Sequence, residues 1–532
     1  MAPPTTITPS NGPLGRTISE LTAPVWSRRP RPEPGSAEPE ASTVRTVTTL
    51  HDDSSLAALD HPRDDALLRE ERAGDHRFTC AEGPFHAYER TLAVDGDRVV
   101  ERVEYRLAIP GWGWLFQLPI RHLLRHPRPD AAWWMPPDRL GARTATALAC
   151  LAAFTLVAGY TGTLIGQTIA FAADDFGASD RAQGIVLACT RAGVLLALAA
   201  GALADRYGRR TLIRTTSYAV CLLTATGALA PSLVVLGVSQ TVARGLSTAL
   251  ALLIAVLSAE LVPRNSRAWT VSILALSAAL GSGMAVWLLP LADLGEPAWR
   301  LLYLVPLAGI PFTTAVIRGL PESDRFVTAL ERPPARAHGD RLWLLGASAF
   351  LGLVFAAPAS QFLNDFLKDD LGYSAARISA FTLLTNTPAI IGIVVGGRLA
   401  DVRGRRVVGA VAMAGGVGLT VAMYLSQGWA LWALSVAGGI VGAAAVPALG
   451  VYGPELFATS ARGRANGLIS TLGVIGSAVG LLVVGSLSDR EGGVADAMPY
   501  VAVGPLLLAV LILVAYPETA HQELEDLNPE DR

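Results

Sequence analysis

The chain has 532 residues, of which 51% are hydrophobic and 17% are charged, and its formal net charge at pH 7 is −2. A charge balance this close to zero argues against a nucleic-acid partner, which would demand a basic surface. The four cysteines stand alone, three of them inside apolar runs, so they favour neither a disulfide framework nor a metal site. We therefore expect no metal, no cofactor and no nucleic acid.

Residues 1–76 are predicted to form a disordered cytoplasmic tail. They are rich in proline, serine and charged residues, as in the run Arg29-Pro-Arg-Pro-Glu-Pro-Gly35, and poor in aromatic residues. They contain no apolar segment of the kind that a secretory signal needs, so no cleaved leader is expected.

Residues 77–142 are predicted to be a small cytoplasmic region that contains a β-hairpin. Phe85–Val94 and Val99–Ile109 alternate as strands do, and Asp95-Gly96 between them is a typical turn. Glu101 interrupts the apolar face of the second strand. Because an isolated hairpin is only marginally stable, this one must pack on another part of the chain or on a partner.

An aromatic and basic segment follows the hairpin. It runs from Trp112 to Leu124 and is followed by Trp133 and Trp134. Such a mixture is typical of the membrane interface, where amphipathic rings and basic side chains are both accommodated. A small soluble domain that buries the aromatic rings is the alternative, and the sequence leaves both open.

From residue 143 onward, apolar segments of about 20 residues recur, each long enough to span a membrane. The twelve segments are 145–170, 184–204, 212–230, 233–259, 268–291, 299–317, 342–364, 376–397, 407–425, 429–452, 466–487 and 498–515. The fold class is therefore an all-α membrane protein with two six-helix halves. The halves are residues 143–319 and 342–516, joined by a cytoplasmic loop at 320–341 and followed by a cytoplasmic tail at 517–532.

The distribution of basic residues orients the helices. With the N-terminus placed inside, seventeen arginines fall in the inner loops, whereas four arginines and one lysine fall in the outer loops. The positive-inside rule then puts both termini in the cytoplasm. We expect a multi-pass protein of the plasma or inner membrane.

Two polar turns carry the same pattern. Gly201-Ala-Leu-Ala-Asp-Arg-Tyr-Gly-Arg-Arg210 returns 196 positions later as Gly397-Arg-Leu-Ala-Asp-Val-Arg-Gly-Arg-Arg406. The first glycine lets two helices approach closely, and the second allows a tight reversal. The aspartate sits at a helix end, within reach of basic groups or of the N-terminus of a neighbouring helix.

This repeated pattern resembles the signature of the major facilitator superfamily of secondary transporters, over residues 143–527. Four further stretches are similar to its sugar-porter and metabolite–proton symporter branches: Glu260-Leu-Val-Pro-Arg-Asn-Ser-Arg267, Leu320-Pro-Glu-Ser-Asp-Arg-Phe326, Tyr452-Gly-Pro-Glu-Leu-Phe-Ala-Thr-Ser-Ala-Arg-Gly463 and Pro517-Glu-Thr519. The resemblance implies the twelve-helix major facilitator fold, which works by alternating access in the lipid bilayer. We expect a monomer.

Acidic and basic residues at the cytoplasmic helix ends are predicted to form ion pairs that close the inner side and break when it opens. The predicted gating network is Asp205, Arg209, Glu260, Arg267, Asp401, Arg405, Glu455 and Arg462. The alternative is that these are solvated loop charges, each contributing less than about 1 kcal/mol to stability.

The residues that usually carry protons in proton-coupled sugar porters are not all present. Those proteins usually have the sequence G-Y-D in helix one. This chain has Gly159-Tyr-Thr161 there, so Thr161 takes the place of the acidic residue. The expected arginine of helix four falls on Gln240, and Arg244 lies one turn nearer the cytoplasm on the same face. The coupling ion therefore stays open.

Ionisable residues deep inside membrane helices are costly and are functional candidates by default. Arg191 and Arg244 lie about 21 and 24 Å from the cytoplasmic helix ends, at the usual rise of about 1.5 Å per residue. Two arginines without a nearby intramembrane acid would attract an anion; the alternative is that they bond backbone carbonyls. The candidate substrate-binding residues are Tyr160, Thr161, Arg191, Gln240, Arg244, Gln361, Asn364 and Asn386.

The sequence thus predicts a secondary active transporter for a small organic solute, with an anionic metabolite as one option. An enzyme is not expected, because no phosphate-binding loop is present and no histidine lies in a predicted membrane helix. Two alternatives stay open. One is a multidrug efflux transporter, and the other is a membrane sensor or scaffold that transports nothing.

Overall fold

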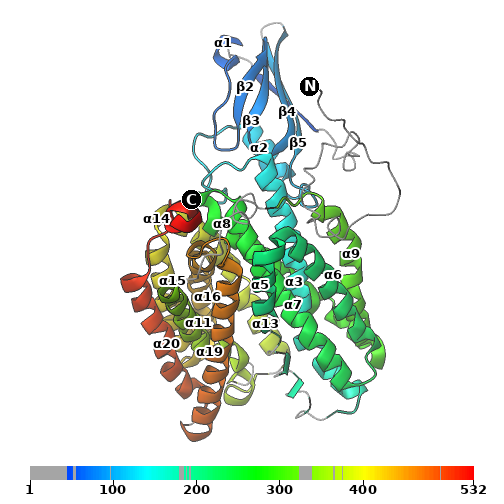
Figure 1. Cartoon of the computed structure of the whole chain (residues 1–532), viewed down its shortest axis with the longest axis vertical. Helices are drawn as coiled ribbons and strands as arrows, with labels where there is room; N and C mark the ends of the chain where they lie inside the picture. Colours follow the sequence, from blue (N-terminus) through cyan, green and yellow to red (C-terminus); the bar gives the residue numbers. More distant parts are fainter. Residues whose placement is uncertain are drawn as a thin grey trace, which may run out of the picture. The chain divides into compact units, whose positions relative to one another are not determined.

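The computed structural model of the chain describes an N-terminal β-sheet domain and a body of long helices (Figure 1). The described residues are 45–51, 56–95, 98–178, 182, 185–186, 189–190, 193, 195–322, 338–363, 366–373, 375–491 and 493–531.

The sheet domain has five antiparallel strands in the order β1-β5-β4-β3-β2. The strands are β1 (Arg45–His51), β2 (Arg69–Gly74), β3 (Arg77–Glu82), β4 (Phe85–Asp95) and β5 (Arg98–Leu107), with the short helices α1 (Leu56–Leu59) and α2 (Gln117–Arg125). The predicted hairpin is confirmed: β4 and β5 are paired, with Val94 opposite Val99.

The prediction of a disordered tail up to residue 76 is wrong for its last part. β1 pairs along its whole length with β5, and β2 pairs with β3. Both strands are mostly polar: β1 buries Val47, and β2 buries Glu70. Their order therefore comes from backbone pairing and from partners elsewhere in the sheet, which local composition does not reveal. Residues 1–44 lie outside the described residues.

Glu101, which interrupts the apolar face of β5, belongs to a buried ion cluster and is only 2% exposed. It accepts hydrogen bonds from Arg63 and from His51, the latter at 3.0 Å. Beside it, the Arg90 guanidinium donates to Glu70 at 2.7 Å and lies 4.1 Å from the centre of the Phe78 ring. Polar groups buried in this way are stable because each has charged partners.

In the described part of the chain, eleven segments are long and apolar enough to cross a membrane. The helices of the body are α3 (Ala142–Asp175), α5 (Leu195–Tyr207), α6 (Arg209–Thr226), α7 (Leu233–Leu261), α8 (Arg267–Trp287), α9 (Arg300–Ile317), α11 (Gly339–Gln361), α13 (Ala375–Asn386), α14 (Ala389–Arg403), α15 (Arg405–Tyr424), α16 (Gly428–Ala443), α17 (Ala445–Gly450), α18 (Tyr452–Glu455), α19 (Arg462–Glu491), α20 (Val494–Ala515) and α21 (Leu524–Leu527). The predicted all-α membrane fold with a β-containing extension is confirmed. The predicted segment 184–204 lies partly outside the described residues, which include its second part as α5.

The helices before residue 320 and those after residue 338 gather into two groups (Figure 1). In each group, equivalent helices cross closely at glycines. A Cβ atom on Gly281 of α8 would lie 2.0 Å from the Leu156 oxygen of α3, and one on Gly480 of α19 would lie 2.0 Å from the Val354 oxygen of α11. Small residues permit this backbone approach, which is how membrane helices pack without a hydrophobic driving force.

We predict that Gly281→Ala lowers the thermal unfolding temperature of the detergent-solubilised protein, because the added methyl group meets a backbone oxygen that cannot move aside. The control is Gly418→Ala in α15, where a Cβ atom would meet no atom within 4 Å. That control should be neutral or slightly stabilising, since alanine is the better helix former by about 1 kcal/mol. Equal unfolding temperatures for the two variants would contradict the packing described.

Candidate functional site

The two copies of the repeated pattern form two similar turns at one end of the helical body, which we call the charged end. Gly208 separates α5 from α6 with φ of +92°, and Gly404 separates α14 from α15 with φ of +100°. Glycine is the residue that adopts such angles without strain. The predicted tight reversal is present in both copies.

Asp401 caps a helix of the other half. Its carboxylate accepts hydrogen bonds from the backbone N–H groups of Ala268 at 3.2 Å and Trp269 at 2.8 Å, in the first turn of α8. The approach depends on Gly397, where a Cβ atom would lie 2.0 Å from the Ser272 hydroxyl oxygen. A carboxylate at this position accepts hydrogen bonds from two backbone N–H groups that would otherwise be unpaired. Its negative charge is also stabilised by the positive end of the helix dipole.

Glu455 joins two arginines from opposite halves. Arg267 of α8 donates to one carboxylate oxygen at 3.2 Å, and Arg405 of α15 donates to the other. Arg405 also contacts Asp401 at 3.3 Å and the Thr519 hydroxyl at 2.8 Å. We call Arg267, Glu455 and Arg405 the first triad.

Glu260 joins a second pair of arginines. Arg462 of α19 donates to it at 2.5 Å, and Arg209 of α6 lies 3.6 Å from the same oxygen. Arg209 also donates to the backbone oxygen of Thr459, across the boundary between the halves. We call Arg209, Glu260 and Arg462 the second triad.

The two triads are near copies of each other. Arg405 lies 196 positions after Arg209, Glu455 lies 195 after Glu260, and Arg462 lies 195 after Arg267, so each residue of one triad has its equivalent in the other. All six side chains and Asp401 are at most 5% exposed. The alternative of solvated loop charges is therefore wrong for these seven residues. Removing one partner from a buried ion pair costs about 3–5 kcal/mol, because the other charge stays buried.

Two further glutamates, which lie in the motifs named above but outside the predicted network, cap the helices that begin at the turns. Glu518 accepts from the backbone N–H groups of Arg405 at 3.0 Å and Arg406 at 3.2 Å. Glu322 accepts from the N–H group of Arg210 at 3.2 Å. Their spacing of 196 residues matches that of the turns, so the repeat itself was the signal that could have found them.

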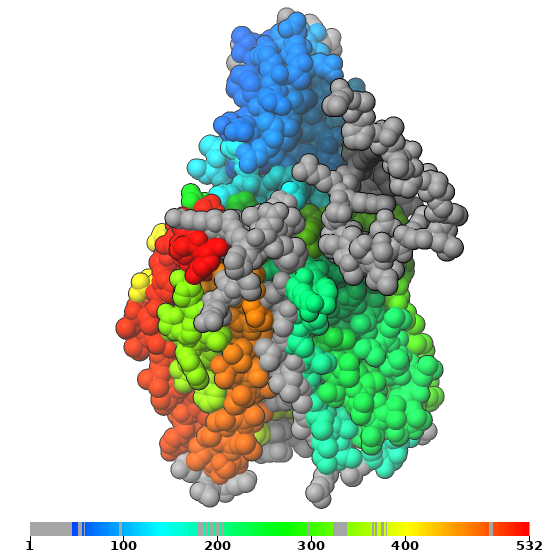
Figure 2. Space-filling model, viewed as in Figure 1, coloured from blue at the N-terminus to red at the C-terminus, as the bar shows by residue number. Residues whose placement is uncertain are grey.

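The C-terminal segment, red in Figure 2, packs on the charged end. Arg267 donates to the backbone oxygen of Gln522 at 3.2 Å, and the Asn528 amide donates to that of Glu455 at 2.7 Å. Thr519, Leu524 and Asn528 are fully buried. These residues therefore take part in the closure of this end.

The segment that follows α2 links the sheet domain to both halves at the charged end. Asp138 accepts from Asn265 at 2.9 Å, and its N–H group donates to the Ser266 hydroxyl at 3.0 Å. The Trp269 indole donates to the oxygen of Trp134 at 3.0 Å. On the other half, Arg398 of α14 donates to the oxygen of Met135 at 3.1 Å.

A second link connects the sheet to α3. The His86 ring lies 3.3 Å from the Thr146 hydroxyl, which also donates to the oxygen of Ala108 at 3.0 Å. Burial, with Arg106 nearby, lowers the pKa of His86, which favours the neutral ring.

A cavity of about 290 Å³ lies between the two halves. Arg244 and Thr248 of α7 and Thr190 line it on one side, and residues of α11 and α19 line it on the other. The structure thus brings together two of the predicted substrate residues, Arg244 and Gln361. Hydroxyl groups of Thr190, Thr248, Ser360 and Ser477 complete a polar lining.

Three other predicted substrate residues are engaged in packing within the first half. The Tyr160 hydroxyl donates to the oxygen of Leu302 at 2.8 Å. Thr161 lies 2.7 Å from the Ser247 hydroxyl, and the Gln240 amide donates to the oxygen of Thr224 at 3.3 Å. Their part in binding stays a prediction.

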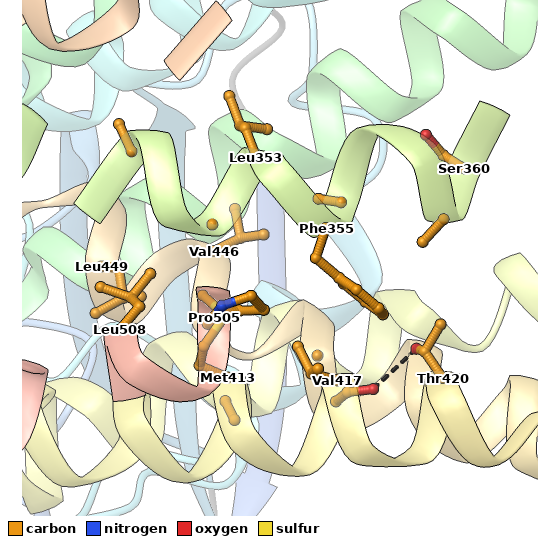
Figure 3. A pocket seen from close by; sticks show the side chains of 18 of the residues that line it. Leu353, Phe355, Ser360, Met413, Val417, Thr420, Val446, Leu449, Pro505 and Leu508 are labelled. Carbon is orange, nitrogen blue, oxygen red and sulfur yellow. Dashed lines mark hydrogen bonds between the residues drawn. The ribbon is translucent and has the colours of Figure 1, made fainter. Parts of the chain in front are cut away.

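Asn386 lines a larger cavity of about 920 Å³ inside the second half, between α11, α15, α16 and α20. The side chains drawn in Figure 3 are mostly apolar, among them Phe355, Met413 and Leu508, and the Thr420 hydroxyl bonds the oxygen of Gly416 at 2.8 Å. Arg191, Asn364 and the side chain of Asp205 lie outside the described residues, so their predicted roles stay predictions.

Comparison with known proteins identifies this architecture. Residues 342–531 match the family model of the Major Facilitator Superfamily. None of the curated protein sequences compared with the chain matches it. Among solved structures, the proton:xylose symporter XylE bound to 6-bromo-6-deoxy-D-glucose is similar with a TM-score of 0.63 and 17% identity, over 74% of this chain and 99% of that one.

Two further structures are similar. The human organic anion transporter MFSD10 has a TM-score of 0.58 and 16% identity, over 69% of this chain and 99% of its own. The transporter FucP in its outward conformation has a TM-score of 0.57 and 14% identity, over 70% of this chain and 98% of its own. At these identities the likeness concerns the fold.

We predict that Glu260→Gln opens the charged end, because it leaves Arg209 and Arg462 buried without their shared carboxylate. If the closed state loses about 3 kcal/mol of stability relative to the open state, the population of the open state rises about 100-fold. The measurement is the rate at which a water-soluble maleimide labels the thiol introduced by Ala461→Cys, in a protein whose four native cysteines are replaced by serine. Ala461 is buried and directly precedes Arg462 of the second triad.

The matched control is Glu104→Gln on the sheet, whose pair with Arg102 is exposed to solvent. That pair contributes less than about 1 kcal/mol, so labelling should not change. Equal labelling rates in Glu260→Gln and the control would rule out a closing role for the second triad.

Proposed function

We propose that this member of the major facilitator superfamily, recognised by the family model over residues 342–531 and by its fold, is a secondary active transporter. It would move a small organic solute by alternating access across the plasma or inner membrane, as a monomer, with both termini in the cytoplasm. The observation that carries this proposal is the pair of buried triads that join the two halves, together with a cavity lined by residues of both halves.

The triads act as a gate in this proposal. With the charged end closed, Glu455 and Glu260 each hold one arginine from the other half. Opening that end requires both contacts to break and Asp401 to leave the first turn of α8. Since such an arrangement is either made or broken, it favours two discrete states rather than a continuous deformation.

The inter-half cavity is the proposed substrate site. Its volume of about 290 Å³ is at the lower limit for small-molecule sites, so the solute is small. Arg244 supplies a guanidinium that can bind a carboxylate, and Gln361 and the hydroxyl groups supply hydrogen bonds. These groups favour a small polar anion, such as a hydroxylated carboxylic acid.

Two alternatives from the sequence keep some support. The apolar 920 Å³ cavity in the second half suits a hydrophobic compound and would fit an efflux transporter. The bonds from Asp138 and Trp134 to the charged end would fit a sensor in which the helical body positions the sheet domain.

We predict that a small hydroxylated carboxylate raises the thermal unfolding temperature of the purified protein and that Arg244→Ala abolishes this shift. The control is Arg214→Ala. It removes an exposed arginine of α6 that is not one of the residues lining the cavity. Sugars, hydrophobic cations and carboxylates are tested in parallel. Stabilisation by sugars or cations alone, unchanged in Arg244→Ala, would contradict the anion site and leave the transporter proposal standing.

We predict further that Asp401→Asn slows solute uptake into proteoliposomes while the thermal shift with ligand persists, because Asp401 serves the gate and does not line the cavity. If this variant binds the ligand but does not transport it, Asp401 acts in the gate and not in the substrate site. A wild-type protein that shows no saturable flux with any solute that stabilises it would overturn the transporter proposal in favour of the sensor.

A further inference from the structure

An apolar groove of about 330 Å³ lies between the sheet domain and the membrane helices. One wall is formed by Trp112, Phe116 and Ile120, from α2 and the turn before it. The other wall is formed by α3 and α8, with Leu148, Ile273 and Leu280 among its side chains. Neither the gate nor the inter-half cavity uses this groove.

The groove continues along a membrane span. Its lining residues on α8 run from Trp269 through Ile273 to Leu280, at the spacing of one helix face. From Trp269 to Leu280 there are eleven steps along the helix, which at about 1.5 Å per residue extend about 16 Å. They start at the charged end and reach the middle of the span 264–292, where Leu280 is exposed. The groove is therefore continuous with the hydrocarbon layer around the helix.

Water is a poor occupant of this groove. Almost all of its lining is apolar, and its one charged lining residue, Arg139, is already engaged by Asp64 and by the backbone oxygen of Asp65. A buried water needs two or more polar partners, which the apolar walls do not offer. A hydrocarbon chain would instead regain the dispersion contacts that an empty apolar space forfeits.

The edge of the groove has the composition of a membrane interface. Leu118 of α2 is 78% exposed and Trp114 is 69% exposed, which is unfavourable in water and natural among lipid headgroups. Arg121 and Arg125 lie exposed on the same helix, whose other face packs into the domain through Ile120. The helix carries no acidic residue, so its charge is complementary to anionic headgroups.

We propose that this groove binds one hydrocarbon chain of an anionic phospholipid from the surrounding bilayer, with Arg121 and Arg125 beside its headgroup. The bound chain fills the space between α2 and the two membrane helices and so holds the sheet domain against them. Because Trp134 and Met135 line the groove and also bond Trp269 and Arg398, lipid binding stabilises the links between the sheet domain and the charged end.

The test uses the full-length protein in vesicles that contain brominated phosphatidylglycerol or brominated phosphatidylcholine. Bromine on the acyl chain quenches nearby tryptophans, and Trp112, Trp134 and Trp269 line the groove. We expect phosphatidylglycerol to quench at a lower mole fraction than phosphatidylcholine. The double variant Arg121→Gln/Arg125→Gln should raise the phosphatidylglycerol fraction needed for half-maximal quenching by about fivefold or more, since each basic group near the surface attracts anionic lipid.

Two variants separate the groove from the general lipid contact of a membrane protein. Ala152→Phe fills the groove from α3 and should reduce quenching by either lipid, whereas Arg102→Gln on the exposed face of the sheet should change nothing. Since a filling variant can misfold, the arginine double variant, whose side chains face solvent, keeps the proposal testable. Equal quenching by the two lipids that is unaffected by the arginine changes would overturn it, as would an Ala152→Phe protein that is folded and quenched like the wild type.

Discussion

A single carboxylate shared by two guanidinium groups from opposite halves is the interaction on which the charged end depends. Glu455 and Glu260 each occupy this position, and in each triad the two positive charges outnumber the one negative charge. Such a cluster is stable in a buried place only while all its members are present. At the first triad, Asp401 contacts Arg405 and Glu518 caps the helix that begins at Arg405, so both add negative charge there. Closure of this end is therefore a cooperative property of both halves.

The sequence predicted this end of the molecule well because the information is local and repeated. The pattern around Asp401 occurs twice, and each copy sits between two long apolar segments, so the turn, the close helix contact and the shared end of the helical body all follow from it. The caps made by Glu518 and Glu322 were missed. A glutamate that caps a helix more than 100 residues away leaves no local mark, although the spacing of the repeat carried the signal.

The direction in which a helical side chain points could not be predicted from the sequence. Counting residues gives a position for Arg244 along its helix, but only packing decides that Arg244 lines the cavity and that Thr161 bonds Ser247. The sheet domain shows the same limit. β1 is a polar strand that owes its order to β5, and the buried Glu101 owes its stability to Arg63, which lies 38 residues earlier in the chain. Such partners are brought together by tertiary structure, which a single sequence does not display.

The sheet domain makes the nearly symmetric charged end unequal. The bonds from Asp138 and Trp134 reach Ser266 and Trp269, which flank Arg267 of the first triad, and Arg398 lies on the helix that ends beside the same triad. These additional bonds beside the first triad resist separation of the two halves at that triad, whereas the second triad is held by its own contacts. In the proposed transport cycle, the two halves would part by rotating about the braced side, so the sheet domain, which precedes the first copy of the repeat, would set the axis of opening.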